Sequence, residues 1–392
     1  MKKKTRTRQP SAASRKPTRE RTSSARGSRP TAQRPADSKG APTIAPGKRI
    51  VVTGSVAFDY LMTFPGKFTE HLIPDKMHRL SVSFLVDEMR RVPGGCGPNI
   101  AYGLALLGER PVLLATAGKD AEPYREKLAR DGVDVSWLRI EPDVFTASFF
   151  VSTDQDQNQL ASFYTGAMAR ARGLRLAAAG LSTIAFVVIS PNDPPAMAQL
   201  TADCRAAGIP FLYDPSQQVT RLSGEEMREG LRGAAILIVN DYEFGILTHK
   251  TGLSREQLER EAPVVIVTHG PDGSTIHAPD GRGGRETHAI PAAKVESEAV
   301  DPTGVGDMYR AGLLRGLRIG APWPVAGRIG SISAVFGIES LGPQPPRYAP
   351  GDFIARYRRN FGDAEELSRL FGDGAKKPPG GRKAAGTAKR RR

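Results

Sequence analysis

The sequence predicts an α/β protein with a doubly wound, mostly parallel sheet sandwiched by helices and covered at one edge by a small β-sheet lid. Short runs of aliphatic and β-branched residues, bounded by Gly, Pro or Asp, recur between stretches with helical spacing. These runs are continuously apolar and do not alternate, which is typical of parallel strands buried on both faces by helices. Two regions without helices alternate instead, and they predict the lid.

Each strand of the main sheet is predicted from one apolar run. The expected strands are Ile50–Gly54, Val112–Ala117, Ile184–Ser190, Phe211–Asp214, Ile236–Asn240 and Val264–Thr268. Helices are expected between and after them at Asn99–Leu107, Pro123–Asp131, Ala196–Ala207, Gly224–Leu231, Tyr242–Thr248 and Arg255–Glu261. Because parallel strands end at one common edge, a ligand crevice is expected at that edge.

The lid is predicted from residues 57–92 and 144–168, where the strand–helix rhythm stops. Segments such as Arg79–Phe84 and Ala147–Ser152 alternate polar and apolar residues, with no helical stretch between neighbouring runs. We expect a small antiparallel sheet built from these two insertions. It would lie over the crevice at the strand ends.

Charge divides the chain into a body and two tails. Lys and Arg total 56 and Asp and Glu 41, a formal charge of +15. Residues 1–47 hold 13 of the basic residues against two acids, and residues 374–392 hold eight against none, so residues 48–373 are mildly acidic. The tails are rich in Ser, Thr, Pro, Gly and Ala. We expect them to be disordered, and the body to be one folded domain.

The basic tails predict weak, sequence-independent binding to RNA or DNA, because positive segments release counterions from polyphosphates. A solvated spacer with no partner is the alternative. Deleting residues 1–47 is expected to leave the activity of the body nearly unchanged while weakening retention on nucleic acid or heparin.

Several classes of protein are excluded by composition. No apolar run approaches the roughly 18 residues of a membrane span, and the first residues lack the apolar stretch of a signal peptide, so we expect a cytoplasmic protein without a membrane partner. Only Cys96 and Cys204 are present, which excludes a disulfide scaffold. The six histidines form no HExxH or His-x3-His pair. A histidine-built metal site is therefore not expected.

The segment Asp301–Gly312 carries the most specific chemical signal. Gly304 and Gly306 flank a turn, and apolar residues at helical spacing follow. Amides in the first turn of a helix lack intrahelical acceptors and face outward with the positive end of the dipole. Such a turn suits a phosphoryl group, and glycine allows its close approach.

Asp307 stands within this turn, although a carboxylate repels a bound phosphate. A general base that takes the proton of an acceptor hydroxyl beside a transferring phosphoryl group would account for it. An aspartate that only caps the helix is the alternative. No G-x4-G-K-[ST] loop and no complete G-x-G-x-x-G run occurs, so other phosphate-binding folds are not favoured.

Four motifs in the same order give a resemblance to the ribokinase-like, or PfkB, family of carbohydrate and nucleoside kinases. The family's D-T-x-G-A-G-D signature is matched by Asp301–Asp307, with Pro at its second place and Val at its fifth. Its glycine pair is matched by Gly94–Asn99, its N-x-x-E element by Asn240–Glu243, and its T-x-G-x-x-G loop by Thr268–Gly273. The resemblance covers residues 48–345.

Longer stretches are similar to the actinobacterial-type adenosine kinases of this family. They are Val52–Asp59, Ser81–Asp87, Ala161–Met168 and Asp214–Gln218. This resemblance implies transfer of the γ-phosphate of ATP to the 5′-hydroxyl of adenosine, which gives AMP in purine salvage. It implies Mg²⁺ as cofactor and raises the question of a monovalent cation.

The resemblance also implies roles for individual residues. Asp307 would be the catalytic base, with backbone donors from Gly304, Val305 and Gly306. Asp59 and Asn99 would bind ribose hydroxyls, and Asn99 would also cap its helix. The remaining substrate candidates are Ser55, Ser83, Gly95, Phe149, Phe163, Gln217 and Gln218, of which the two phenylalanines would sandwich the purine. Asn240, Thr268, Gly270 and Gly273 would contact ATP, and Glu243 would belong to the magnesium shell through water.

Ordinary structural roles remain open for these residues. Asp59 could cap a helix, Gly95 could be a plain turn glycine, and the two phenylalanines could pack the core of the small sheet. A sugar kinase or another nucleoside kinase would use the same base and anion site. A nucleic-acid-associated nucleoside-binding protein without turnover is a further alternative. Two chains could also pair through the open edges of the lid to form a homodimer.

Overall fold

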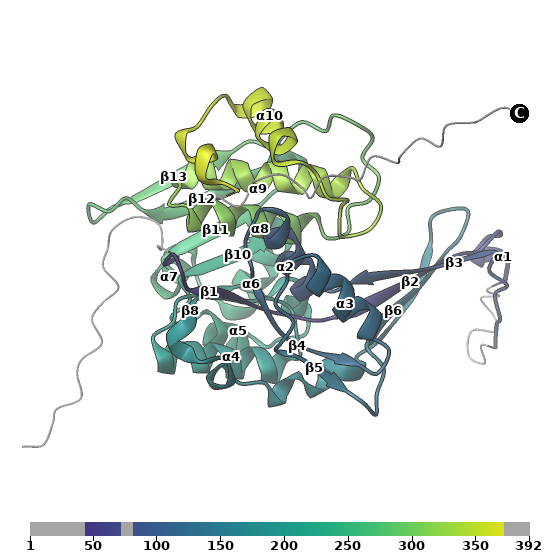
Figure 1. Ribbon diagram of the computed structural model, residues 1–392. Helices are drawn as coiled ribbons and strands as arrows, with labels where there is room; N and C mark the ends of the chain where they lie inside the picture. The colour runs from purple at the N-terminus through teal and green to yellow at the C-terminus, as the bar shows by residue number, and fades with distance from the viewer. Residues whose placement is uncertain (1–43, 72–80, 372–392) are drawn as a thin grey trace, which may run out of the picture. The chain divides into compact units, whose positions relative to one another are not determined.

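The computed structural model describes residues 44–71 and 81–371, and both predicted tails lie mostly outside them (Figure 1). The predicted boundary at residue 47 is wrong, because Ile44 is 0% exposed and belongs to the core of the domain. The first basic segment therefore ends by residue 43, and the folded domain begins earlier than its charge pattern indicates.

The large sheet has nine strands in the order β13-β12-β11-β10-β9-β8-β1-β4-β5 among the described residues. The strands are β1 (Arg49–Thr53), β4 (Val112–Gly118), β5 (Leu138–Glu141), β8 (Ile184–Ile189), β9 (Phe211–Tyr213), β10 (Ile236–Asn240), β11 (Val264–Thr268), β12 (Ser274–Pro279) and β13 (Arg285–Ile290). The seven from β11 to β5 are parallel, whereas β12 and β13 extend one edge as an antiparallel hairpin. The six predicted strands are confirmed to within one residue at each end.

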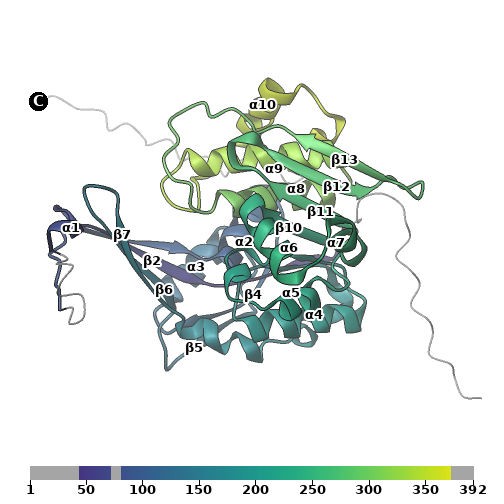
Figure 2. The same ribbon diagram turned by 180° about the vertical axis from the view of Figure 1, so that it is seen from behind.

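Helices cover both faces of this sheet, as Figures 1 and 2 show from opposite sides. One face carries α2 (Cys96–Leu106), α3 (Glu122–Arg130), α8 (Val305–Arg318) and α9 (Trp323–Ile338), with α10 (Pro350–Phe361) packed outside α9. The other carries α4 (Pro194–Ala207), α5 (Gly224–Leu231), α6 (Asp241–Thr251) and α7 (Arg255–Glu261). Short 3₁₀ turns lie at Gly166–Gly173, Leu176–Ala179, Leu181–Thr183, Ser216–Thr220, Gly270–Asp272 and Glu365–Arg369.

Alternate residues of each strand separate the two cores. In β1, Ile50 and Val52 pack with α2 and α8, whereas Val51 packs with the helices of the opposite face. All three are fully buried. Burying one such side chain stabilises the fold by about 1.5–3 kcal/mol. The predicted α/β sandwich is confirmed, and its continuous apolar strands follow from the two helical layers.

The lid is a second sheet of four strands in the order β3-β2-β6-β7. They are β2 (Ala57–Thr63), β3 (Glu88–Gly94), β6 (Ala147–Thr153) and β7 (Gln159–Tyr164), and the short helix α1 (Phe68–His71) follows β2. The expectation of a wholly antiparallel lid is wrong, because the central pair β2 and β6 is parallel. In the chain, β2 directly follows β1 and β6 directly follows β5. Because β1 and β5 run in the same direction through the large sheet, β2 and β6 are parallel as well.

The strand expected at Arg79–Phe84 is not found. Residues 79 and 80 lie outside the described residues, and residues 81–86 form no strand. The ring of Phe84 instead packs edge-on against Phe64 and Phe68. No helix in the described part of the chain is both long and apolar enough to cross a membrane.

Candidate active site

The candidate site lies at the carboxyl edge of the large sheet, near β1. Chain connections run outward from β1 in two directions, through β4 and β5 on one side and from β8 to β11 on the other. Such a switch point leaves a crevice outside the strand ends. Helices α2 and α8 pack against each other with both N-termini at this edge. Two helix N-termini thus meet where a ligand is expected.

Asp307 is buried in the first turn of α8, with 9% of its surface exposed. Its Oδ2 accepts a hydrogen bond of 2.9 Å from Nδ2 of Asn99 in α2. Burial raises the pKa of Asp307 to about 6, although Arg310 and the bond from Asn99 oppose the shift. The carboxylate is therefore ionised at neutral pH but more basic than an exposed aspartate, which is the property a general base needs.

The turn before Asp307 presents free amides. Gly304 has a φ of +74°, and the amides of Gly304 and Gly306 donate to no backbone carbonyl of the described residues. The amide of Val305, in contrast, donates to the carbonyl of Pro302 at 3.3 Å. Val305 is therefore a weaker candidate for the anion site than its two neighbours. The free amides can bind a phosphoryl oxygen.

This turn is held in place by Asp301. Its Oδ1 accepts a bond of 2.8 Å from the amide of Thr303, and its Oδ2 accepts one of 3.0 Å from Gly342. A Cβ on Gly304 would lie 2.5 Å from the Cβ of Pro343. Only glycine fits there, both for its φ and for the space.

A buried ion pair that was not predicted from the sequence begins one turn after Asp307 in α8. Arg310 and Asp214 are 6% and 1% exposed. They meet through two contacts, Nε to Oδ2 at 2.6 Å and Nη2 to Oδ1 at 2.7 Å. Arg310 follows Asp307 by three residues, so both lie on one face of α8. That spacing of an arginine within an otherwise apolar helix face was the available signal.

Asn99 positions the candidate base. It lies within α2, whose N-cap is Gly95, so the predicted capping role of Asn99 is wrong. While its Nδ2 donates to Asp307, its Oδ1 accepts a bond of 3.2 Å from Gln344. Gln344 also donates to the hydroxyl of Tyr124 at 2.6 Å. Both ends of the Asn99 amide are thus fixed by the protein.

The lid brings three predicted substrate residues onto one face. Asp59 of β2 is opposite Phe149 of β6, which is opposite Phe163 of β7. Directly opposed residues on adjacent strands point to the same side of a sheet. Burial, and then the charge of Asp301, raise the pKa of Asp59 to about 6. The helix-capping alternative for Asp59 is wrong, because it lies within a strand.

The aromatic residues of the lid differ in exposure. Phe149 is half-buried and Phe163 is 46% exposed, so neither is packed as an ordinary core residue. On the opposite face, Tyr60 stacks on Phe150 at 4.7 Å. The face that carries Asp59 therefore has aromatic surface that is only partly covered in the described part of the chain.

Only glycine fits at position 95, whatever its role in substrate binding. Its φ is +95°, and a Cβ there would collide with the carbonyl of Ser55. The amide of Ser55 donates to the carbonyl of Pro191 at 2.8 Å, which places Ser55 beside the start of α2. Cys96 is half-buried next to it, and desolvation raises the pKa of its thiol, so we assign this cysteine no chemistry.

Asn240 and Glu243 form a capping box at the start of α6. Glu243 Oε2 accepts from the amide of Asn240 at 2.9 Å, and Asn240 Oδ1 accepts from the amide of Glu243 at 2.7 Å. This ordinary structural role occupies one carboxylate oxygen and leaves the other free for a bridging water. No cluster of three metal-ligating side chains occurs in residues 44–71 and 81–371.

The predicted ATP loop lies next to Asn240. Thr268 ends β11 directly opposite Asn240, and the turn after it is closed by a bond of 2.8 Å from the amide of His269 to Gly273. Gly270 and Gly273 have φ values of +57° and +92°. A Cβ on Gly273 would collide with the carbonyl of Ile290, so the fold itself requires this glycine.

Three predicted substrate residues form no hydrogen bond with the residues around Asp307 in the described part of the chain. Ser83 is exposed in the irregular segment before β3, and Gln217 is exposed in the 3₁₀ turn Ser216–Thr220. Gln218 is buried, and its Nε2 donates to the carbonyl of Asn192 at 2.9 Å. Its Oε1 and Nδ2 of Asn192 are buried without a hydrogen-bond partner in the described chain. Asn192, after β8, was not predicted from the sequence.

Comparison with known proteins identifies the family of this chain. The model of the pfkB family of carbohydrate kinases matches residues 52–349, which include the lid and every element of the site described above. The chain belongs to the pfkB family. It is a kinase, a phosphotransferase that acts on a hydroxyl group, and the family resemblance read from its four motifs is confirmed.

Other members of the pfkB family are similar over most of the chain. A nucleoside kinase of Methanothermobacter thermautotrophicus is 30% identical over 80% of this chain and 96% of its own length. The structure of a Burkholderia thailandensis nucleoside kinase in complex with inosine is 36% identical, with a TM-score of 0.70 over 80% of this chain and 98% of that one. A ribokinase of Thermotoga maritima, 20% identical over 80% of this chain and all of that one, has a TM-score of 0.65 and shares the fold.

Proposed function

We propose that this pfkB kinase transfers the γ-phosphate of ATP to the 5′-hydroxyl of a purine nucleoside, with adenosine as the first candidate. The observation that carries the proposal is the buried carboxylate of Asp307 beside the free amides of Gly304 and Gly306. It is supported by the lid face that carries Asp59 and Phe149.

In the proposed reaction, Asp307 accepts the proton of the 5′-hydroxyl as its oxygen attacks the γ-phosphorus. The bond to the β-phosphate oxygen breaks, and ADP leaves on the side opposite the attack. The amides of Gly304 and Gly306 stabilise charge on the transferring group, and one such donor contributes roughly 3–4 kcal/mol in the transition state. Asn99 acts as a positioning residue, because its amide holds Asp307 at 2.9 Å.

The lid would supply substrate specificity. A carboxylate accepts hydrogen bonds from two vicinal hydroxyls, so Asp59 would bind the ribose. Phe149 and Phe163 would stack on the purine, since their face of the lid is only partly covered. Ser55, Gln218 and Gln217 remain candidates for the polar edges of the nucleoside, as does Ser83.

ATP would lie across the carboxyl ends of β10 and β11, against Asn240, Thr268, Gly270 and Gly273. Mg²⁺ would accompany its phosphates and neutralise their charge, with Glu243 contributing through water. A monovalent cation near the site remains part of the proposal.

Inosine is a specific competitor for the role of substrate, because a 36% identical kinase binds it. Adenine presents an amino group at C6 where hypoxanthine presents a carbonyl oxygen, so a site optimised for one leaves a polar group unpaired with the other. A sugar kinase would need no aromatic surface on the lid. A nucleoside-binding protein without turnover would keep the lid but not the base.

A coupled assay of ADP release with adenosine, inosine, guanosine, ribose and fructose tests the proposal. We expect kcat/KM for the best purine nucleoside to exceed that for either sugar at least 100-fold. A preference for ribose or fructose would overturn the nucleoside assignment. Tight nucleoside binding with no ADP release would overturn the kinase reaction.

Two further properties are proposed from the sequence. The basic tails would add weak, sequence-independent nucleic-acid binding, which deletion of residues 1–43 would reduce.

Homodimers would form through β7, an edge strand of the lid whose six residues are all exposed. Sedimentation at micromolar concentration tests dimerisation, and a monomer at all concentrations would contradict it.

A further inference from the structure

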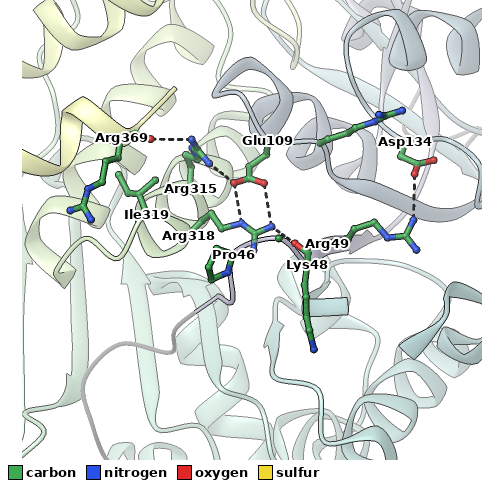
Figure 3. A pocket seen from close by; sticks show the side chains of 11 residues that line it. Pro46, Lys48, Arg49, Glu109, Asp134, Arg315, Arg318, Ile319 and Arg369 are labelled. Atoms are coloured by element: carbon green, nitrogen blue, oxygen red, sulfur yellow. Dashed lines mark hydrogen bonds and ion pairs between the residues drawn. The ribbon is translucent and has the colours of Figure 1, made fainter. Parts of the chain in front are cut away.

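A basic pocket lies at the edge of the large sheet opposite the active site. It has a volume of about 680 Å³ and lies where β1 begins and where α2 and α8 end (Figure 3). Six basic and two acidic side chains line it: Lys48, Arg49, Arg110, Arg315, Arg318, Arg369, Glu109 and Asp134. The pocket therefore carries excess positive charge.

Both acids in the pocket are already paired. Glu109 accepts from Arg315 and Arg318, and Arg318 also donates to the carbonyl of Lys48 (Figure 3). Arg318 donates to the carbonyl of Ala45 as well. Asp134 pairs with Arg49 at 3.5 Å. These arginines tie the beginning of the described chain to the ends of α2 and α8, so their role is structural.

Three cations of the pocket form no ion pair in the described part of the chain, although Arg110 lies close enough to Asp134 to interact with its charge. Lys48, Arg110 and Arg369 make no side-chain hydrogen bond or ion pair within residues 44–71 and 81–371. Cations often lie at helix C-termini because they complement the helix dipole. That explanation fails for Lys48, which precedes β1, whereas Arg369 lies in the last turn of the 3₁₀ helix Glu365–Arg369.

Both basic tails attach at this pocket. Pro46 and Gly47 line it directly after the first tail, and Arg369 lines it just before the second. Residues 1–43 contain 13 Lys and Arg, and residues 372–392 contain eight. The sequence on both sides of the described residues is therefore also basic, so a polyanion complements the charge of the pocket better than either tail does.

We propose that this basic pocket binds the phosphate backbone of a double-stranded nucleic acid without regard to its sequence. No aromatic residue lines the pocket, so unpaired bases have no surface on which to stack. A duplex carries one charge per roughly 1.7 Å, which favours it over a single strand at a site that reads only phosphates. The proposal is independent of the kinase substrate, because the active site is at the opposite edge.

Fluorescence anisotropy with a labelled duplex of about 20 base pairs and mixed sequence tests the proposal. The full chain is compared with a pocket variant, Lys48→Gln/Arg110→Gln/Arg369→Gln, over a range of KCl concentrations. The matched control is Arg232→Gln/Arg260→Gln/Arg282→Gln, which removes three cations from the same sheet edge outside the pocket. Thermal unfolding and kinase activity verify that each variant is folded.

The pocket variant should bind the duplex at least tenfold more weakly, and its slope of log K against log [KCl] should fall by about 3, because each lost phosphate contact removes about 0.9. The control should change affinity less than threefold. Equal losses of affinity in both variants would mean that only the net charge of the protein matters, and this would overturn the proposal. If 0.1 mM tripolyphosphate displaces the duplex, the pocket is a site for small anions. If saturating duplex raises the KM for ATP, the nucleic acid binds in the active site. Either result would also overturn it.

Discussion

At the scale of single residues, two carboxylates link pH to activity. Burial raises the pKa values of Asp307 and Asp59 to about 6 each. In the proposed reaction both carboxylates act as acceptors only when ionised, so log kcat/KM should fall below pH 6 with a slope approaching two. In Asp59→Asn the slope should fall to one, at a lower plateau. Asp280→Asn, at a half-buried position in the β12–β13 turn, serves as control, and identical profiles for all three enzymes would contradict the assignment.

The limit of sequence reasoning is also visible at this scale. Asp307, Gly304 and Asn240 could be singled out because each lies in a short motif whose chemistry is local. The spacing of Arg310 from Asp307 singles out the arginine, but its partner Asp214 is 96 positions away, so no local pattern predicts the pair. The bond of Asn99 to Asp307 joins residues 208 positions apart, so it too was not predictable from a local pattern.

At the scale of elements, the ion pair between Arg310 and Asp214 connects α8 to the end of β9. Arg310→Met would leave the Asp214 carboxylate buried without a partner, at a cost of about 3–5 kcal/mol in the free energy of unfolding. Asp214→Leu should cost a similar amount. The double variant should recover most of the loss, which urea unfolding measures. Single variants within 1 kcal/mol of the native protein would show that the pair is not buried as described.

The turn before α8 allows a second test at this scale, with a matched control. Gly304 and Gly320 both have a φ of +74°, but only Gly304 lies against Pro343, while Gly320 has open space. Alanine at either position should cost about 1–2 kcal/mol of stability through backbone strain. Only Gly304→Ala should also lower kcat, at least tenfold, because the clash moves the amides at the start of α8. Equal kcat values would mean that this turn does not position the phosphoryl group.

At the scale of the whole molecule, the folded domain begins before its charge pattern indicates. Deleting residues 1–43 should leave kcat and the melting temperature nearly unchanged. Deleting residues 1–47 removes Ile44, which is fully buried, and the carbonyl of Ala45 that accepts from Arg318. We expect a loss of about 2–5 kcal/mol from Ile44 alone. Equal melting temperatures for the two truncations would contradict this boundary.

The fold as a whole was predictable where it depends on local pattern. Six of the seven parallel strands were predicted to within one residue because a strand covered by helices on both faces is continuously apolar, whereas the short edge strand β5 was not predicted. The hairpin of β12 and β13 and the helices α9 and α10 were not predicted. The lid was placed correctly, but its parallel pair of β2 and β6 depends on the direction of two distant strands of the large sheet.

The central claim is that the carboxylate of Asp307 takes the proton of the acceptor hydroxyl. The most direct measurement is kcat and KM of Asp307→Asn with Mg·ATP and the best nucleoside from the panel. Because asparagine keeps the shape but cannot accept the proton, kcat should fall about 10²–10⁴-fold with a modest change in KM. A kcat within threefold of the native enzyme would contradict the account.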